Sequence, residues 1–97
     1  MIEVKLCNNE FLRQFEVERN NTLARIEYAE QERKIFLTNI IIPRKIYSKE
    51  FEENFIKKTL EFIANKNLRV VPTSPKIASF VRQNKSYKSL LPVGIKL

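Results

Sequence analysis

The fold is decided by residues 35–65, which read IFLTNIIIPRKIYSKEFEENFIKKTLEFIAN. The apolar residues of 35–42 fall on both faces of an extended chain, which predicts a central strand covered on both sides. Pro43 ends this strand because proline cannot donate to a ladder. From Ser48 onward the apolar residues recur every three or four positions, which predicts a helix ending near Asn65.

The start of this helix has two sequence features that are typical of helix N-termini. Ser48 is predicted to be the N-cap, and three glutamates follow in the first turn, where the helix dipole favours negative charge. The apolar stripe is expected to pack against the sheet and consists of Phe51, Phe55, Ile56, Leu60 and Ile63.

Three strands are predicted before the central one. The first covers residues 2–6 and ends at a turn over Asn8-Asn9, and the second covers residues 11–18. A hairpin turn at Asn20-Asn21 leads into residues 22–29, which are followed by a turn over Glu30–Glu32. The predicted inward side chains are Ile2, Val4, Leu6, Phe11, Phe15, Val17, Ala24, Ile26 and Tyr28.

Two further elements follow the long helix. Residues 68–71 are predicted to form a short buried strand, which lies parallel to the central strand through a right-handed crossover. Ser74-Pro75 reads as an N-cap with proline at the first helical position, and it opens a second helix. Its inward residues are Ile77, Phe80 and Val81, and Tyr87 and Leu90-Leu91 dock the tail. The result is one α+β domain over residues 1–97, with the order β-β-β-β-α-β-α.

The composition narrows the possible sites. The chain has one cysteine, Cys7, and no histidine or aspartate, which argues against a disulfide, a Cys-rich zinc site or any metal site. Cys7 is expected to be a buried or edge thiol. The only glycine is Gly94, so a ligand loop that needs positive φ must form without it. No apolar run is long enough to span a bilayer, and we expect a cytoplasmic protein without a membrane partner.

The net charge of +7 lies in the last third of the chain. Residues 66–97 hold seven of the 18 basic residues and none of the 11 glutamates, so residues 1–65 are balanced. Such a patch favours an anionic partner, for example a nucleic acid, a membrane surface or a phosphorylated cofactor. It is equally explained as a solvated surface.

The predicted topology also indicates where a ligand binds. In such sheets, ligands favour the carboxyl end of a central strand beside the following helix N-terminus. A candidate site is therefore expected around residues 39–50, facing residues 72–75.

Four motifs around these positions resemble one known family. They are Ala24-x-Ile26-x-Tyr28, Asn39-Ile40-Ile41-Ile42-Pro43, Lys45-Ile46-Tyr47-Ser48-Lys49-Glu50 and Val71-Pro72-Thr73-Ser74-Pro75. Together with the element order they resemble the GNAT superfamily of acetyl-CoA-dependent N-acetyltransferases, in particular its minimal single-domain branch. The resemblance implies a GNAT-like, mostly antiparallel twisted sheet whose last strand is parallel to the fourth.

The resemblance also implies a site for acetyl-CoA or CoA. The implied cofactor-binding residues are Ile41, Ile42, Lys45, Tyr47, Ser48, Lys49, Glu50 and Phe51. The family loop, Arg/Gln-x-x-Gly-x-Gly/Ala, has glycines where this chain has Ser48 and Glu50, so the loop is degenerate. The repulsion between a carboxylate and a phosphate about 5 Å apart is roughly 3 kcal/mol at an effective dielectric near 20. Lys45 and Lys49 offset part of this repulsion.

The branch's histidine and cysteine correspond to Asn39 and Ser74, the candidate catalytic residues. Ser74 cannot replace a thiolate, and its structural role would be that of an N-cap. Asn39 is expected to be a hydrogen-bonded core amide. Transfer would then depend on positioning, on a backbone N–H of Ile41 or Ile42 for the oxyanion, and on water or a glutamate such as Glu27 as base.

Three functions are therefore open. The first is an N-acetyltransferase that transfers acetyl from acetyl-CoA to an amine of a small molecule or protein. The second is a catalytically inactive GNAT-like domain that acts as a protein-interaction module. The third is a nucleic-acid binder. Two observations argue against it: Phe80 and Tyr87 are expected to be packing residues, and no recognition motif is present.

Overall fold

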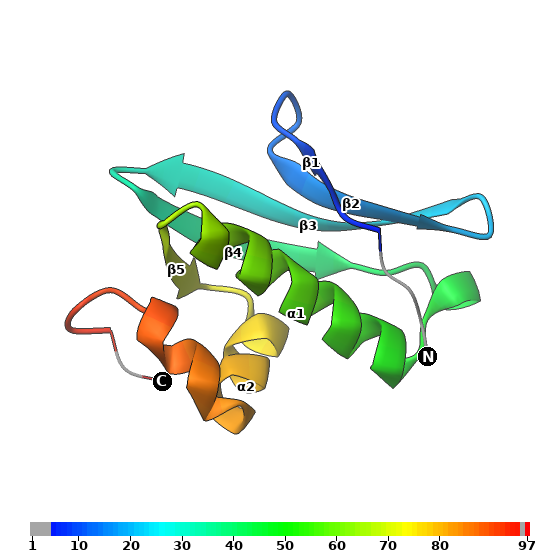
Figure 1. Ribbon diagram of the computed structural model, residues 1–97. Coiled ribbons are helices and arrows are strands. Elements are labelled where there is room, and N and C mark those ends of the chain that lie inside the picture. The colour runs from blue at the N-terminus through cyan, green and yellow to red at the C-terminus, as the bar shows by residue number, and fades with distance from the viewer. Residues whose placement is uncertain (1–4, 96) are drawn as a thin grey trace.

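The computed structural model describes residues 5–95 and residue 97. Within these residues a five-stranded sheet packs against two α-helices (Figure 1). The strands are β1 (Cys7–Asn9), β2 (Gln14–Arg19), β3 (Thr22–Gln31), β4 (Lys34–Ile41) and β5 (Arg69–Pro72). The helices are α1 (Lys49–Asn65) and α2 (Pro75–Gln83), with short 3-10 helices η1 (Arg44–Ile46) and η2 (Lys85–Leu90). The predicted order and the α+β class are confirmed.

The strands lie in the sheet in chain order, β1-β2-β3-β4-β5. The first four are antiparallel, and β5 is parallel to β4, as predicted. A parallel pair needs a crossover, and α1 supplies it. The strand predicted to be central, β4, is therefore next to the last strand, and β3 occupies the middle.

Both hairpin turns between the long strands use left-handed backbone. Asn20 and Asn21 have φ of 52° and 59°, which confirms the predicted turn. The next turn lies at Glu32 and Arg33, with φ of 51° and 64°, because β3 continues to Gln31. Two-residue hairpin loops of this kind need φ > 0 at both positions, which asparagine tolerates better than glutamate or arginine.

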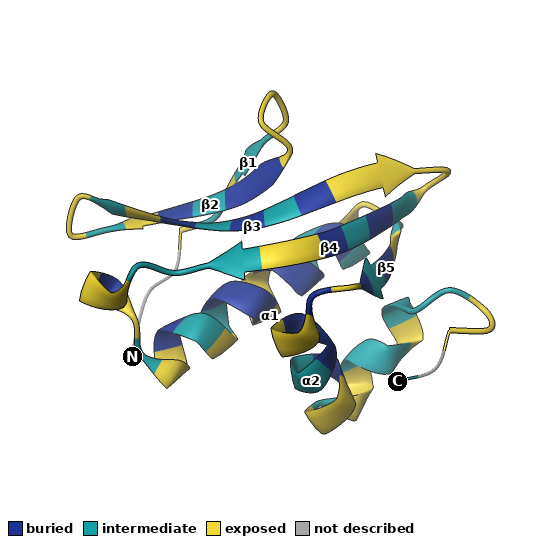
Figure 2. Ribbon diagram, turned by 180° about the vertical axis from the view of Figure 1, so that it is seen from behind, coloured by how far each residue is buried: buried dark blue, intermediate teal, exposed yellow. Residues whose placement is uncertain are grey.

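Within the residues that the structure describes, only one face of the sheet is covered. Ile35 and Leu37 of β4 are 3% and 0% exposed, whereas Thr38 and Asn39 lie on the surface. Figure 2 shows this change along β4, from dark blue to yellow. The prediction that this strand is covered on both faces is wrong, because α1 and α2 lie on the same side of the sheet (Figures 1 and 2).

The core lies between the sheet and the two helices. The predicted apolar stripe of α1 is buried in full, which confirms its orientation. In α2, Ile77 and Val81 are buried, while Phe80 is half-buried and packs against Tyr87 at a ring distance of 5.7 Å. Tyr87 and Leu90-Leu91 pack against the core, as predicted for the tail.

The N-terminal strands differ most from the prediction. Phe11 is 93% exposed and lies in a turn, because Arg13 adopts φ of 57° and β2 starts only at Gln14. Asn8 and Asn9 belong to β1 and do not form the predicted turn. Ile2 and Val4, predicted to face inward, lie outside the described residues. Cys7 is an exposed thiol on the edge strand β1.

Candidate functional site

A gap opens between β4 and β5 where their pairing ends. The two strands pair from Lys34 opposite Arg69 to Leu37 opposite Pro72. The carbonyl of Leu37 then accepts hydrogen bonds from the Ser74 backbone N–H at 2.9 Å and from Thr73 Oγ1 at 3.1 Å. Beyond Leu37, β4 continues to Ile41, while the segment that follows β5 turns into α2. One edge of β4 is thus not covered by β5.

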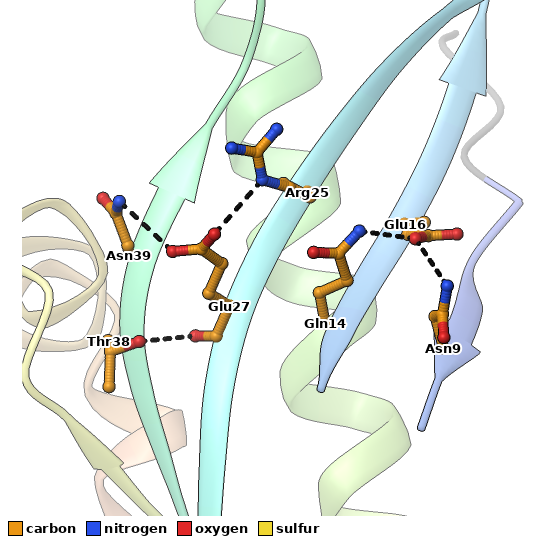
Figure 3. Close-up of polar contacts among 7 residues, drawn as sticks. All are labelled: Asn9, Gln14, Glu16, Arg25, Glu27, Thr38 and Asn39. Carbon is orange, nitrogen blue, oxygen red and sulfur yellow. Dashed lines mark hydrogen bonds and ion pairs between the residues drawn. The ribbon is translucent and has the colours of Figure 1, made fainter. Parts of the chain in front are cut away.

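A β-bulge lies at the mouth of this gap. Tyr28 is opposite Leu37 and Glu27 is opposite Asn39, so Thr38 is the extra residue. The Thr38 hydroxyl donates to the Glu27 carbonyl at 3.1 Å (Figure 3). Bulges re-aim side chains near functional sites, and this one directs Asn39 to the open face of the sheet.

Asn39 is hydrogen-bonded, as predicted, but it is exposed and not in the core. The reason is that no element covers this face of β4 within the described residues. Its Nδ2 donates to Oε1 of Glu27 at 3.4 Å, and Arg25 Nε pairs with the other Glu27 oxygen at 3.3 Å (Figure 3). The Glu27 side chain is 39% exposed. The structure therefore places Glu27, whose position could not be predicted, beside Asn39.

Ser74 lies on the other side of the same gap. It is 3% exposed and stands at the cap position of α2, where its carbonyl accepts the Ala78 N–H at 2.9 Å. Its side chain makes no capping hydrogen bond, so the predicted capping role holds for the backbone only. Asn39 and Ser74 are both brought to the end of the β4–β5 pairing, since the Ser74 amide binds the carbonyl two residues before Asn39.

The segment between β4 and α1 supplies the other predicted site residues. Ile41 and Ile42 are half-buried, and Lys45, Tyr47 and Lys49 are exposed. Ser48 caps α1 as predicted, because its Oγ accepts the Phe51 N–H at 3.0 Å. The Phe51 side chain is fully buried. The backbone N–H groups of Lys49 and Glu50 therefore remain as the first-turn donors that a helix leaves free of intrahelical partners.

This loop forms without glycine and without strain. The residues with positive φ in the described part of the chain all lie outside residues 43–50. Ser48 has φ of −149°, which any residue adopts. Glu50 lines a hollow between α1 and the segment formed by the end of α2 and η2, together with Glu53, Lys57 and Phe80. The residues that replace the family glycines are therefore not required to adopt positive φ, and they add side-chain bulk and charge.

A groove of about 370 Å³ runs between α1 and α2 from the start of both helices. Its walls include Tyr47, Lys49, Glu52, Ile56, Lys76 and Phe80. No sequence motif indicates this groove directly, because the residues that face each other across it come from helices separated by β5. The basic Lys76, immediately after Ser74-Pro75, was the one available signal.

Other ionisable groups with a shifted pKa lie away from this groove. Burial raises the pKa of Tyr28 above 10.0, although its hydrogen bond to Asn8 acts in the opposite direction. Burial also raises the pKa of Tyr87, and Glu61 adds to the effect. Across residues 5–95 and 97, no cluster of three or more candidate ligands is arranged to hold a metal ion. No helix of the described chain has the length and apolarity needed to cross a membrane.

Comparisons with known proteins found a matching family model and solved structures of similar fold. The family model for the GCN5-related N-acetyl-transferases matches residues 14–90. The NMR solution structure of a GCN5-like protein from Staphylococcus aureus superposes with a TM-score of 0.70 at 17% sequence identity. The superposition covers 99% of this chain and 94% of the other, which shows that the fold is GNAT-like. The comparison with curated proteins found no match.

Proposed function

We propose that this chain, which belongs to the GCN5-related N-acetyltransferase family, transfers the acetyl group of acetyl-CoA to an amine. Acetyl-CoA is the donor that members of this family generally use. The observation that carries the proposal is the separation of β4 from β5 beyond Leu37 and Pro72. This separation leaves one edge of β4 open in a fold whose two helices also enclose a groove.

The start of α1 fits an anionic group. The backbone N–H groups of Lys49 and Glu50 lie in its first turn, and a helix N-terminus favours negative charge. Lys45 and Lys49 are exposed beside it. Glu50 is not among the residues that line the groove, and it lines the neighbouring hollow, of which Lys57 is also part. We therefore assign the pyrophosphate of the cofactor to this position.

Bound acetyl-CoA would supply an acetyl thioester, and the chain would supply positioning, a proton acceptor and an oxyanion donor. We assign the proton acceptor to Glu27, whose carboxylate is held by Arg25 and Asn39 and remains accessible. We assign the oxyanion donor to a backbone N–H of Ile41 or Ile42, at the end of β4. Asn39 then acts as a positioning residue for Glu27.

Thermal unfolding with and without 1 mM acetyl-CoA tests the cofactor assignment. A site with a dissociation constant near 10 μM would gain about 2.7 kcal/mol at this hundredfold excess. For a domain of this size the melting temperature is expected to rise by roughly 10 °C or more. Lys49→Glu should reduce the rise, whereas Lys58→Glu, on the exposed side of α1, should not. An unchanged melting temperature in the unmodified protein would contradict the assignment.

Glu27→Gln tests the proton acceptor. Loss of a general base lowers turnover by about 10²–10⁴-fold. We expect that loss in thiol release from acetyl-CoA with an amine acceptor, while the acetyl-CoA-dependent thermal shift is retained. Glu30→Gln, farther along the same strand, is the matched control and should keep full turnover. Full activity of Glu27→Gln would show that water or another group accepts the proton.

A protein-interaction module is the second candidate, and one observation favours it. Phe11 and Leu12, in the turn between β1 and β2, are 93% and 56% exposed. Adjacent exposed apolar side chains of this size often mark contact sites. This function would gain weight if acetyl-CoA had no effect on unfolding.

A further inference from the structure

Three side chains from different elements meet across the groove between α1 and α2. Lys76 Nζ, in the first turn of α2, lies 3.5 Å from Glu52 Oε2 in the first turn of α1. The same ammonium lies 5.9 Å from the centre of the Tyr47 ring. The Tyr47 hydroxyl donates to the other Glu52 oxygen at 3.5 Å. All three residues line the groove, so together they form a bridge across it.

Glu52 and Lys76, the two charged residues of this bridge, differ in solvent exposure. The Glu52 side chain is 16% exposed and contacts both Tyr47 and Lys76. The Lys76 side chain is 66% exposed. A lysine is a flexible point charge that binds new partners readily, and this one is exposed. Lys76 can therefore change partner, while Glu52 keeps its hydrogen bond from Tyr47.

The groove as it stands is electrically balanced. Its charged lining residues are Lys49 and Lys76 against Glu52 and Glu53. A phosphate that enters this groove meets Lys49 together with two carboxylates, and release of Lys76 from Glu52 would add a second cation. Lys76 is suited to this, because it stands on the wall opposite the start of α1.

We propose that Lys76 is a phosphate-binding residue that exchanges its contact with Glu52 for a phosphate group of the bound cofactor. This inference rests on the proposed function, since it assumes that CoA occupies the groove. In the alternative, the pair is an ordinary surface ion pair that links the two helices. The two explanations differ in whether the charge at position 76 affects ligand affinity.

Titration calorimetry with CoA, at two salt concentrations, separates them. Lys76→Gln is expected to weaken CoA binding about tenfold, in line with the loss of one hydrogen bond between charged groups. Lys76→Arg keeps the charge and should retain most of the affinity. Glu52→Gln should bind CoA at least as tightly as the unmodified protein. Lys58→Gln, an exposed lysine outside the groove, is the control for net charge.

Salt dependence gives a second readout, since screening weakens each charge contact. CoA affinity should fall less steeply with salt in Lys76→Gln than in the unmodified protein. Equal CoA affinity and equal salt dependence in these two proteins would overturn the role of Lys76 and leave the proposed function standing. If the unmodified protein bound no CoA, the proposed function and this inference would both be wrong.

Discussion

Replacing Ser48 by alanine tests how the start of α1 is held, and the structure gives the expected size of the effect. The Ser48 hydroxyl accepts the Phe51 N–H at 3.0 Å, and Phe51 is fully buried below it. Loss of an N-cap hydroxyl costs typically about 1 kcal/mol. For a domain of this length that corresponds to a fall in melting temperature of roughly 4–8 °C.

Two controls make the measurement specific. Ser74→Ala changes the other predicted cap, whose side chain makes no capping bond, and should shift the unfolding free energy by less than about 0.5 kcal/mol. Ser48→Gly should cost only a few tenths of a kcal/mol, because glycine is tolerated at an N-cap. Thermal and urea unfolding followed by circular dichroism would report all three. Equal losses for Ser48→Ala and Ser74→Ala would refute the distinction between the two serines.

Three further outcomes follow from the backbone, the surface and the tyrosines. Replacing Glu32 and Arg33 by Asn-Gly should stabilise the protein by about 1 kcal/mol in urea unfolding, because both residues have positive φ; a loss would contradict the turn geometry. Phe11→Ser should leave the unfolding free energy within about 0.5 kcal/mol, whereas Phe15→Ala, at a position 1% exposed, should cost about 3–5 kcal/mol. Burial raises the pKa of Tyr28, so its contribution to stability is complete below pH 10 and is lost as the pH rises through the folded-state pKa. Tyr28→Phe should therefore show a smaller loss of melting temperature above pH 10, and its phenolate absorbance should lack one late-titrating group.

Short-range sequence signals were sufficient to predict the elements whose ends are marked by capping or turn residues. The N-cap at Ser48 and the stripe that begins at Phe51 predicted α1 and its buried face, and both are confirmed. Pairs such as Asn20-Asn21 predicted a turn because asparagine adopts the left-handed conformation. In each case the deciding interaction spans only a few residues.

The errors arose where distant parts of the chain decide the outcome. Whether the outer face of β4 is covered depends on where α2 packs, which periodicity within residues 35–42 cannot report. The register between β3 and β4 depends on the bulge at Thr38, and this register brings Glu27 beside Asn39. The alternation that placed Phe11 inward was interrupted by a turn at Arg13, whose φ of 57° has no signal in the sequence.

The missing glycines of the cofactor loop have a narrower meaning than the sequence suggested. A glycine is required where φ is positive or where the backbone must approach a ligand closely. The first reason does not apply between residues 43 and 50, because no residue there has positive φ, whereas the second still concerns Ser48 and Glu50. Charge within the groove is a separate factor, since two lysines and two glutamates line it. Under the proposal for Lys76, affinity for a phosphorylated ligand depends on its release from Glu52 as well as on the side chains at positions 48 and 50.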